Sequence, residues 1–172
     1  TLITSSAASD VYKRQRDNFE WGDHCLSDKV TLSNKGFAEL LNPYVVEVLS
    51  EIIEIPYSFK VDNVWKNTYH RYYHQEIHDH QGHELSFVIF MNDYQESDAK
   101  FYFVNERIRV TSSNWTNLCS GSSGAMPDNF QIEPDKGDIL FFPSHMLHGV
   151  SPHKSDTPRV TISGNITIQP RI

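Results

Sequence analysis

Three histidines have the residue type and spacing of a metal site. His78 and His80 flank Asp79, and alternate residues of a β-strand point to the same side, so both imidazoles can bind one ion. A third histidine, His148, follows the apolar segment 137–147 where its hydrophobic run ends. Because two ligands do not close a metal site, we predict that His78, His80 and His148 share one ion.

A strand-like segment with a strictly alternating pattern begins at Arg159. Its apolar residues are Val160, Ile162, Ile166 and Ile168, and its polar residues are Arg159, Thr161, Ser163, Asn165 and Thr167. The period of two predicts a strand with one face in the core. The polar face either lies in water, the commoner outcome for an antiparallel strand, or lines a barrel mouth where arginine binds a carboxylate through two parallel hydrogen bonds.

The chain between His148 and Arg159 favours the second possibility. Segment 151–158 contains two prolines and several turn formers, so we expect the His148 and Arg159 strands to be antiparallel neighbours. Arg159 would then lie about two residues, or roughly 7 Å, beyond His148. That separation suits a five-carbon dicarboxylate with one end on the metal and the other on Arg159, and Thr161 would add a hydroxyl.

The surrounding sequence predicts a mainly β fold. One amphipathic helix is expected, with Asn42 as N-cap, Pro43 in the first turn, an apolar stripe from Val45 to Ile53 and an end before Pro56. Short β-rich runs follow at 61–73, 85–91, 100–104, 130–132, 138–142 and 159–168. Strands without intervening helices indicate a sandwich or barrel, and the metal motif favours a double-stranded β-helix, or jelly roll, with one or two N-terminal supporting helices. Segment 111–129 is rich in Ser, Asn and Gly and predicts a long loop.

Several motifs of this chain resemble a branch of the iron(II)- and 2-oxoglutarate-dependent oxygenases with an H-x-H first motif, some of them phage-encoded. They are Trp65-Lys-Asn-Thr-Tyr69, Gln75-Glu-Ile-His78-Asp-His80, Leu85-Ser86, Gly137-Asp138 and Phe142-Pro-Ser-His-Met-Leu-His148-Gly-Val150. The resemblance covers residues from about 60 to 168. It implies an oxidoreductase, a dioxygenase that couples decarboxylation of 2-oxoglutarate to hydroxylation of a substrate C–H bond.

The same resemblance implies roles for individual residues. His78, His80 and His148 would be the catalytic Fe2+ ligands, Arg159 would bind the C5 carboxylate of the 2-oxoglutarate co-substrate, and Tyr69 would assist it. The substrate, whether a small molecule, a peptide or a nucleobase, is not readable from the sequence. The chain departs from the usual two-histidine, one-carboxylate set, because His80 stands where the carboxylate is expected. We favour three histidines over an inward-turned Asp79, which would break the i, i+2 geometry.

A second family uses the same architecture. His78, His80 and Glu84 resemble the first cupin motif, and Gly137, Pro143 and His148 the second, so a cupin dioxygenase, isomerase or metal-dependent binding module remains an alternative. Arg159 distinguishes the oxygenase from the cupin, because a cupin has no general need for an arginine at this position. A third possibility is a jelly-roll protein without a metal, which predicts that the histidines are dispersed in space.

Other candidate residues have simpler interpretations. Tyr69 also fits ordinary strand packing, and Trp65 and Phe141 are expected in the core. The remaining histidines are expected at the surface or behind the metal ligands, namely His70, His74, His83, His145 and His153.

Composition limits the function classes. The chain has 172 residues, a net charge of -7 and 38% hydrophobic residues, which suits one domain and disfavours nucleic-acid or anionic-membrane binding. Two cysteines are too few for a disulfide framework, and no apolar run has membrane-spanning length, so we expect a cytoplasmic protein. Residues 1–16 resemble a translated library adapter. We therefore expect a single jelly-roll domain over 17–172 with an incomplete N-terminus.

Overall fold

A computed structural model describes residues 26–29, 33–104 and 129–171. The proposed adapter segment, residues 1–16, lies outside these ranges, as does almost all of the predicted loop 111–129. The described elements are β1 (Leu26–Lys29), α2 (Asn34–Ser50), β2 (Tyr57–Tyr69), β3 (Gln75–His78), β4 (Leu85–Phe90), β5 (Phe101–Val104), β6 (Asn129–Gln131), β7 (Ile139–Pro143), β8 (His148–Val150) and β9 (Arg159–Pro170). Within these ranges no helix is long and apolar enough to cross a membrane.

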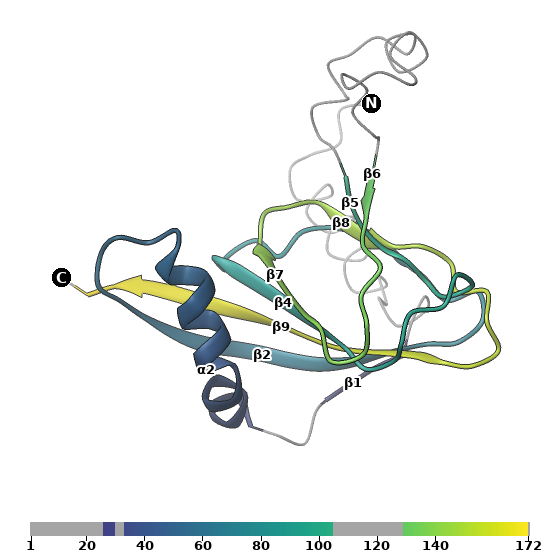
Figure 1. Ribbon diagram of the computed structural model, residues 1–172, viewed down its shortest axis with the longest axis horizontal. Coiled ribbons are helices and arrows are strands. Elements are labelled where there is room, and N and C mark those ends of the chain that lie inside the picture. The colour runs from purple at the N-terminus through teal and green to yellow at the C-terminus, as the bar shows by residue number, and fades with distance from the viewer. Residues whose placement is uncertain (1–25, 30–32, 105–128, 172) are drawn as a thin grey trace, which may run out of the picture.

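The strands form two antiparallel sheets. One has the order β1-β2-β9-β4-β7 and the other the order β3-β8-β5-β6 (Figure 1). An apolar cluster that includes Tyr69, Phe90, Phe101, Phe142 and Val150 contains residues of both sheets and fills the space between them. The predicted mainly β jelly-roll fold is confirmed, with α2 as its supporting helix.

Helix α2 packs on the outer face of the larger sheet, where it crosses β2 and β9 (Figure 1). Its buried residues are Phe37, Leu41, Val45 and Leu49, spaced four apart so that they share one face of the helix. Together with Val61, Phe87 and Ile166 they form a second apolar cluster. The helix therefore stabilises the face of the sheet that points away from the smaller sheet.

The predicted start of this helix was wrong. Ser33 is the N-cap, its hydroxyl accepts the N–H of Gly36 at 3.1 Å, and Pro43 lies inside the helix. Proline removes one helical hydrogen bond, but Pro43 and Glu39, whose carbonyl group loses its partner, are both exposed, so water can solvate that group. Burial of the turns before and after Pro43 outweighs that loss. The helix ends at Ser50, before Pro56, as predicted.

The expected pairing of the His148 and Arg159 strands was also wrong. Strand β8 pairs with β3 and β5, whereas β9 pairs with β2 and β4 in the other sheet. The connection 151–158 is therefore a crossover between sheets and not a hairpin. His153 fixes it, because its Nδ1 accepts the N–H of Ala99 at 3.0 Å and its Nε2 lies 2.8 Å from the carbonyl oxygen of Thr157. As a result, β8 and the start of β9 face one another across the interior.

Candidate metal centre and co-substrate pocket

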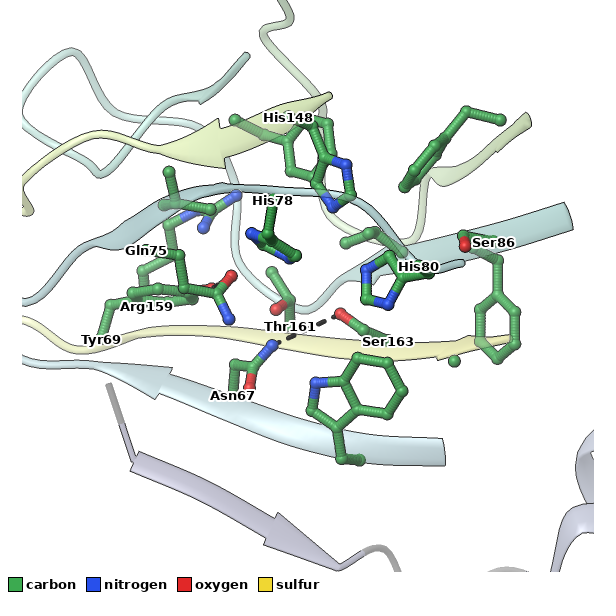
Figure 2. Close-up of a pocket in the computed structure, with 17 residues that line it drawn as sticks. Asn67, Tyr69, Gln75, His78, His80, Ser86, His148, Arg159, Thr161 and Ser163 are labelled. Carbon is green, nitrogen blue, oxygen red and sulfur yellow. Dashed lines mark hydrogen bonds between the residues drawn. The ribbon is translucent and has the colours of Figure 1, made fainter. Parts of the chain in front are cut away.

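The structure brings His78, His80 and His148 together. Their candidate ligand nitrogens all lie within 4.8 Å of one another, in a cavity between the two sheets (Figure 2). His78 is the last residue of β3 and His148 the first of β8, and the two are direct partners in the sheet register. His80 lies two residues beyond the end of β3. The prediction that these side chains converge is confirmed, although His80 is not on a strand.

Two of the imidazoles are fixed by the backbone behind them. Nδ1 of His78 lies 2.7 Å from the carbonyl oxygen of Glu76, and Nδ1 of His148 lies 2.8 Å from that of Met146. A carbonyl oxygen only accepts hydrogen bonds, so each Nδ1 carries the proton and donates. In each ring Nε2 is then the nitrogen that carries the lone pair, which is the form that binds a metal, and the ring orientation is set in advance.

The surroundings keep the cluster uncharged. Burial lowers the pKa of His148 to about 3 and that of His80 to about 4, and it also lowers the pKa of His78. The ring of His148 stacks on Phe101 with centroids 5.3 Å apart and meets Phe142 edge-on at 4.8 Å. All three imidazoles are therefore neutral near pH 7, the form that binds a metal.

Neither candidate carboxylate joins the cluster. Among the described residues, the three histidines alone make up the group whose ligand atoms converge. Asp79 accepts a hydrogen bond from the side chain of Gln81 at 3.3 Å. Glu84, the extra ligand of the cupin alternative, is exposed and accepts the backbone N–H of Ile168 at 2.8 Å. The geometry thus favours a three-histidine set over either carboxylate.

Arg159 lies in the same cavity and is only 7% exposed. Its guanidinium carbon is 5.4 Å from the ring centroids of both Tyr69 and Phe90. Nη1 is buried with no hydrogen-bond partner, and desolvation lowers the pKa of this side chain. Among the described residues that line the cavity, none is acidic. The arginine is thus a buried cation prepared for an anion.

The polar face of β9 forms one wall of the cavity. Arg159, Thr161 and Ser163 are at most 8% exposed and all line it. The possibility that this face is a solvated edge is therefore wrong. The apolar face of the same strand packs on α2, so both faces of β9 are covered, and the polar one faces the histidines (Figure 2).

Comparison with known proteins identifies the family. A family model described as "Putative 2OG-Fe(II) oxygenase" matches residues 63–165, more than half of the chain. The chain belongs to this family of 2-oxoglutarate- and Fe(II)-dependent oxygenases. No curated protein matches its sequence.

Solved structures of such oxygenases have a similar fold. HygX from Streptomyces hygroscopicus, with nickel and 2-oxoglutarate bound, gives a TM-score of 0.59 at 11% identity over 95% of this chain and 79% of HygX. SnoN, a non-heme alpha ketoglutarate dependent epimerase from nogalamycin biosynthesis, gives 0.56 at 12% identity over 99% of this chain and 78% of SnoN. An oxygenase from Burkholderia pseudomallei gives 0.54 at 11% identity over 77% and 55% of the two chains.

Oxygenases of this family use Fe2+ and 2-oxoglutarate, and the cavity fits both. Nitrogens bound to one ion at about 2.1 Å lie roughly 3–4 Å apart, so the histidine cluster needs only a small contraction to hold a metal. A buried guanidinium in the same cavity, with no hydrogen-bond partner at Nη1, fits the far carboxylate of a dicarboxylate.

Tyr69 lies in the cavity beside Arg159. Its hydroxyl donates to Oε1 of Gln75 at 2.7 Å. Gln75 also lines the cavity and was not predicted as a site residue. The only sequence signal for Gln75 was its position three residues before the predicted ligand His78.

Two further residues of the cavity, Asn67 and Trp65, were not predicted as site residues. Asn67 is buried opposite Thr161 in the sheet register, and its Nδ2 donates to Oγ of Ser163 at 3.4 Å. Trp65, expected in the core, is half-buried, with its ring 5.7 Å from that of His80. Trp65 and Asn67 alternate with Tyr69 along β2, so period two from a predicted site residue could have found them.

The other histidines are away from the cluster. His70 and His145 are exposed, and His74 and His83 are half-buried. His153 was expected at the surface or behind the metal ligands, but it is fully buried and its ring nitrogens contact the backbone of Ala99 and Thr157. Its two ring nitrogens serve the crossover described above, which is a structural role.

Proposed function

We propose that this oxygenase holds Fe2+ with His78, His80 and His148 and binds the C5 carboxylate of 2-oxoglutarate with Arg159. Thr161, on the same buried face two residues along β9, would donate its hydroxyl to the co-substrate. Tyr69 would support Arg159 through its ring, since its hydroxyl is bonded to Gln75.

One observation carries the assignment of the co-substrate site. Arg159 is buried in the cavity that contains the histidine cluster, and its Nη1 has no partner. A buried hydrogen-bond donor without a partner is costly, and proteins retain such groups where a ligand completes them. A dicarboxylate that reaches from the histidines to Arg159 would supply the missing acceptor.

Iron and 2-oxoglutarate, when bound, supply the oxidative chemistry, in which O2 and the co-substrate yield succinate, carbon dioxide and an oxidised C–H bond. The residues of this chain would orient the metal and the co-substrate and shield them from water. His78 and His148 present Nε2 because their Nδ1 protons are committed to carbonyl groups. Apolar side chains such as Phe101 and Phe142 exclude water beside His148.

The substrate is proposed to be a small molecule and the reaction a hydroxylation. A structure of HygX contains hygromycin B, and SnoN is named for nogalamycin biosynthesis, which supports small organic substrates on this fold. The net charge of -7 argues against a nucleic-acid substrate. The two-cysteine composition is consistent with a cytoplasmic location.

The decisive experiment measures co-substrate binding to the iron-loaded protein without oxygen. We expect 2-oxoglutarate to bind more tightly than 2-oxobutyrate, which has the same chelating end but lacks the distal carboxylate. A buried, charge-assisted contact with Arg159 is worth about 2–5 kcal/mol, or roughly 30- to 4,000-fold in affinity.

Under air, the same protein should form succinate slowly from 2-oxoglutarate even without its substrate. Equal affinity for the two keto acids, together with no succinate, would refute the assignment. A cupin that uses the same histidines would give that result.

A further inference from the structure

The three histidines are not held in the same way. His78 and His148 face each other in the register of two paired strands, so the sheet sets the distance between them. His80 lies beyond the end of β3, where no strand ladder holds it. Some other contact must fix the third imidazole at the distance that one metal ion requires.

Ser144 makes that contact through its backbone. Its carbonyl oxygen accepts the N–H of His80 at 2.9 Å, and its own N–H donates to the carbonyl oxygen of Glu84 at 3.1 Å. Ser144 therefore binds both ends of the loop from residue 80 to residue 84. It lies in the turn between β7 and β8, four residues before His148, so it connects the loop of His80 to the turn that leads into β8.

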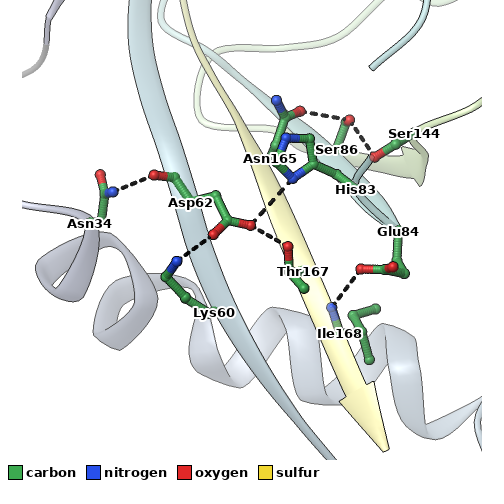
Figure 3. A network of polar contacts seen from close by, with 10 residues as sticks. All are labelled: Asn34, Lys60, Asp62, His83, Glu84, Ser86, Ser144, Asn165, Thr167 and Ile168. Carbon is green, nitrogen blue, oxygen red and sulfur yellow. Dashed lines mark hydrogen bonds and ion pairs between the residues drawn. The ribbon is translucent and has the colours of Figure 1, made fainter. Parts of the chain in front are cut away.

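A buried chain of hydroxyl groups fixes Ser144 in turn (Figure 3). Oγ of Ser144 lies 2.8 Å from Oγ of Ser86, and the Ser86 hydroxyl donates to Oδ1 of Asn165 at 2.9 Å. The single proton of Ser86 is used on the amide oxygen, so Ser144 must donate to Ser86. All three residues are at most 3% exposed. The chain anchors the turn to β4 and β9, the latter being the strand that carries Arg159.

We propose that Ser144 is a positioning residue for His80, acting through the hydrogen-bond chain to Ser86 and Asn165. This inference rests on the proposed role of His80 as a metal ligand. Ser144 does not itself line the cavity, so its effect on a metal must pass through the residues it holds. Groups of this kind, one step removed from the ligands, typically change metal affinity by about 10- to 100-fold when removed.

The side-chain contacts of the same loop are more exposed. Nδ1 of His83 lies 3.3 Å from Oδ2 of Asp62, and the exposed Glu84 accepts the N–H of Ile168 at 2.8 Å (Figure 3). Polar contacts that water can reach contribute little, whereas a buried hydroxyl left without its partner is costly. The buried chain through Ser144 is therefore the contact expected to govern the position of His80.

A double-mutant cycle tests this directly. Co2+ affinity of the metal-free protein is measured for the wild type, Ser144→Ala, His80→Ala and the double variant. Ser144→Ala should weaken binding about 10-fold in the wild type. In the His80→Ala background the same change should cost less than about 2-fold, because a residue that acts only through His80 has nothing left to position. The visible spectrum of bound Co2+ in Ser144→Ala should shift toward that of His80→Ala.

Two further variants make the result interpretable. Ser151→Ala is the matched control, since the Ser151 hydroxyl also makes a hydrogen bond, accepting the N–H of Lys100 at 2.9 Å, but outside the His80 loop. It should leave Co2+ affinity unchanged. Asn165→Leu keeps the side-chain shape while removing the last acceptor of the chain, and it decides the question if Ser144→Ala does not fold.

The outcomes distinguish the positioning role of Ser144 from the ligand role of His80. Equal losses from the serine change in both backgrounds, or no loss in the wild type, would refute the positioning role while leaving His80 as a ligand. A His80→Ala variant that binds Co2+ as tightly as the wild type would refute the ligand role of His80 and the inference with it.

Discussion

Replacing Arg159 by methionine should weaken 2-oxoglutarate binding and stabilise the ligand-free protein. The side chain is 7% exposed, Nη1 lacks a partner, and the pKa is lowered by desolvation more than the attraction of Tyr69 and Asp98 raises it. The protein without ligand therefore bears the cost of a buried charge. Methionine has a similar length and keeps apolar contact with the rings of Tyr69 and Phe90.

The energetic cost of burying the Arg159 guanidinium can be compared with the stabilisation that its ring contacts provide. An unsatisfied buried donor costs about 1–3 kcal/mol, and desolvation of a charge adds to this. The cation-π contacts with two rings return about 0.5–1 kcal/mol each. We therefore expect Arg159→Met to raise the free energy of unfolding by about 1–2 kcal/mol, or about 2–8 °C in Tm for a chain of this size. Its 2-oxoglutarate affinity should fall by about 2–5 kcal/mol.

Thermal unfolding without metal or ligand measures the first effect, and calorimetric titration of the iron-loaded protein without oxygen measures the second. Arg159→Lys is the control, because it keeps the charge and loses the planar fork, and its affinity should be intermediate. A less stable Arg159→Met variant would show that Arg159 is a structural cation. Unchanged 2-oxoglutarate affinity would show that the co-substrate carboxylate binds elsewhere.

Four other changes have expected outcomes. Urea unfolding of the metal-free protein should show that the free energy of unfolding falls as pH drops from 6.5 toward about 3. In that range the His148 imidazole takes up a proton in the unfolded chain but not in the folded protein, where burial lowers its pKa to about 3, so His148→Phe should reduce this pH dependence. In calorimetric titrations His80→Ala should weaken Co2+ binding at least about 10-fold more than Asp79→Ala. Co2+ should quench tryptophan fluorescence, and Trp65→Phe should remove most of this quenching, because the Trp65 ring lies 5.7 Å from that of His80. His153→Leu should lower the free energy of unfolding by about 2–4 kcal/mol, because two backbone groups lose their buried partner.

The features that could be predicted from the sequence are those set by the local geometry of the backbone. The alternation after Arg159 follows from the pleat of a strand. The same period predicted that His78 and His80 converge, although His80 lies two residues beyond the end of β3. The metal cluster could therefore be predicted from three residues. His148 could be predicted as the third histidine from its position at the end of an apolar run. In the structure it begins the short strand that pairs with the strand of His78.

Long-range choices could not be predicted in this way. Which strand β9 pairs with depends on the crossover 151–158, whose turn-forming residues suit a hairpin equally well. The start of α2 depends on burial of Phe37 and Leu41 against a sheet formed later in the chain, which outweighs the local signal of Pro43. The polar face of β9 does face a cavity, as the sequence favoured, but the expected hairpin with the His148 strand was the wrong reason, because the smaller sheet lies opposite this face.

The two faces of β9 connect stability to function. Ile166, fully buried among the apolar residues that α2 covers, fixes which side of the strand faces the helix. Because side chains alternate, that register also turns Arg159 and Thr161 toward the histidines. A slip of one residue would expose the apolar set and remove the arginine from the cavity at the same time. Packing energy on the helix side thus holds a costly buried cation in place on the other side, where the co-substrate is proposed to bind.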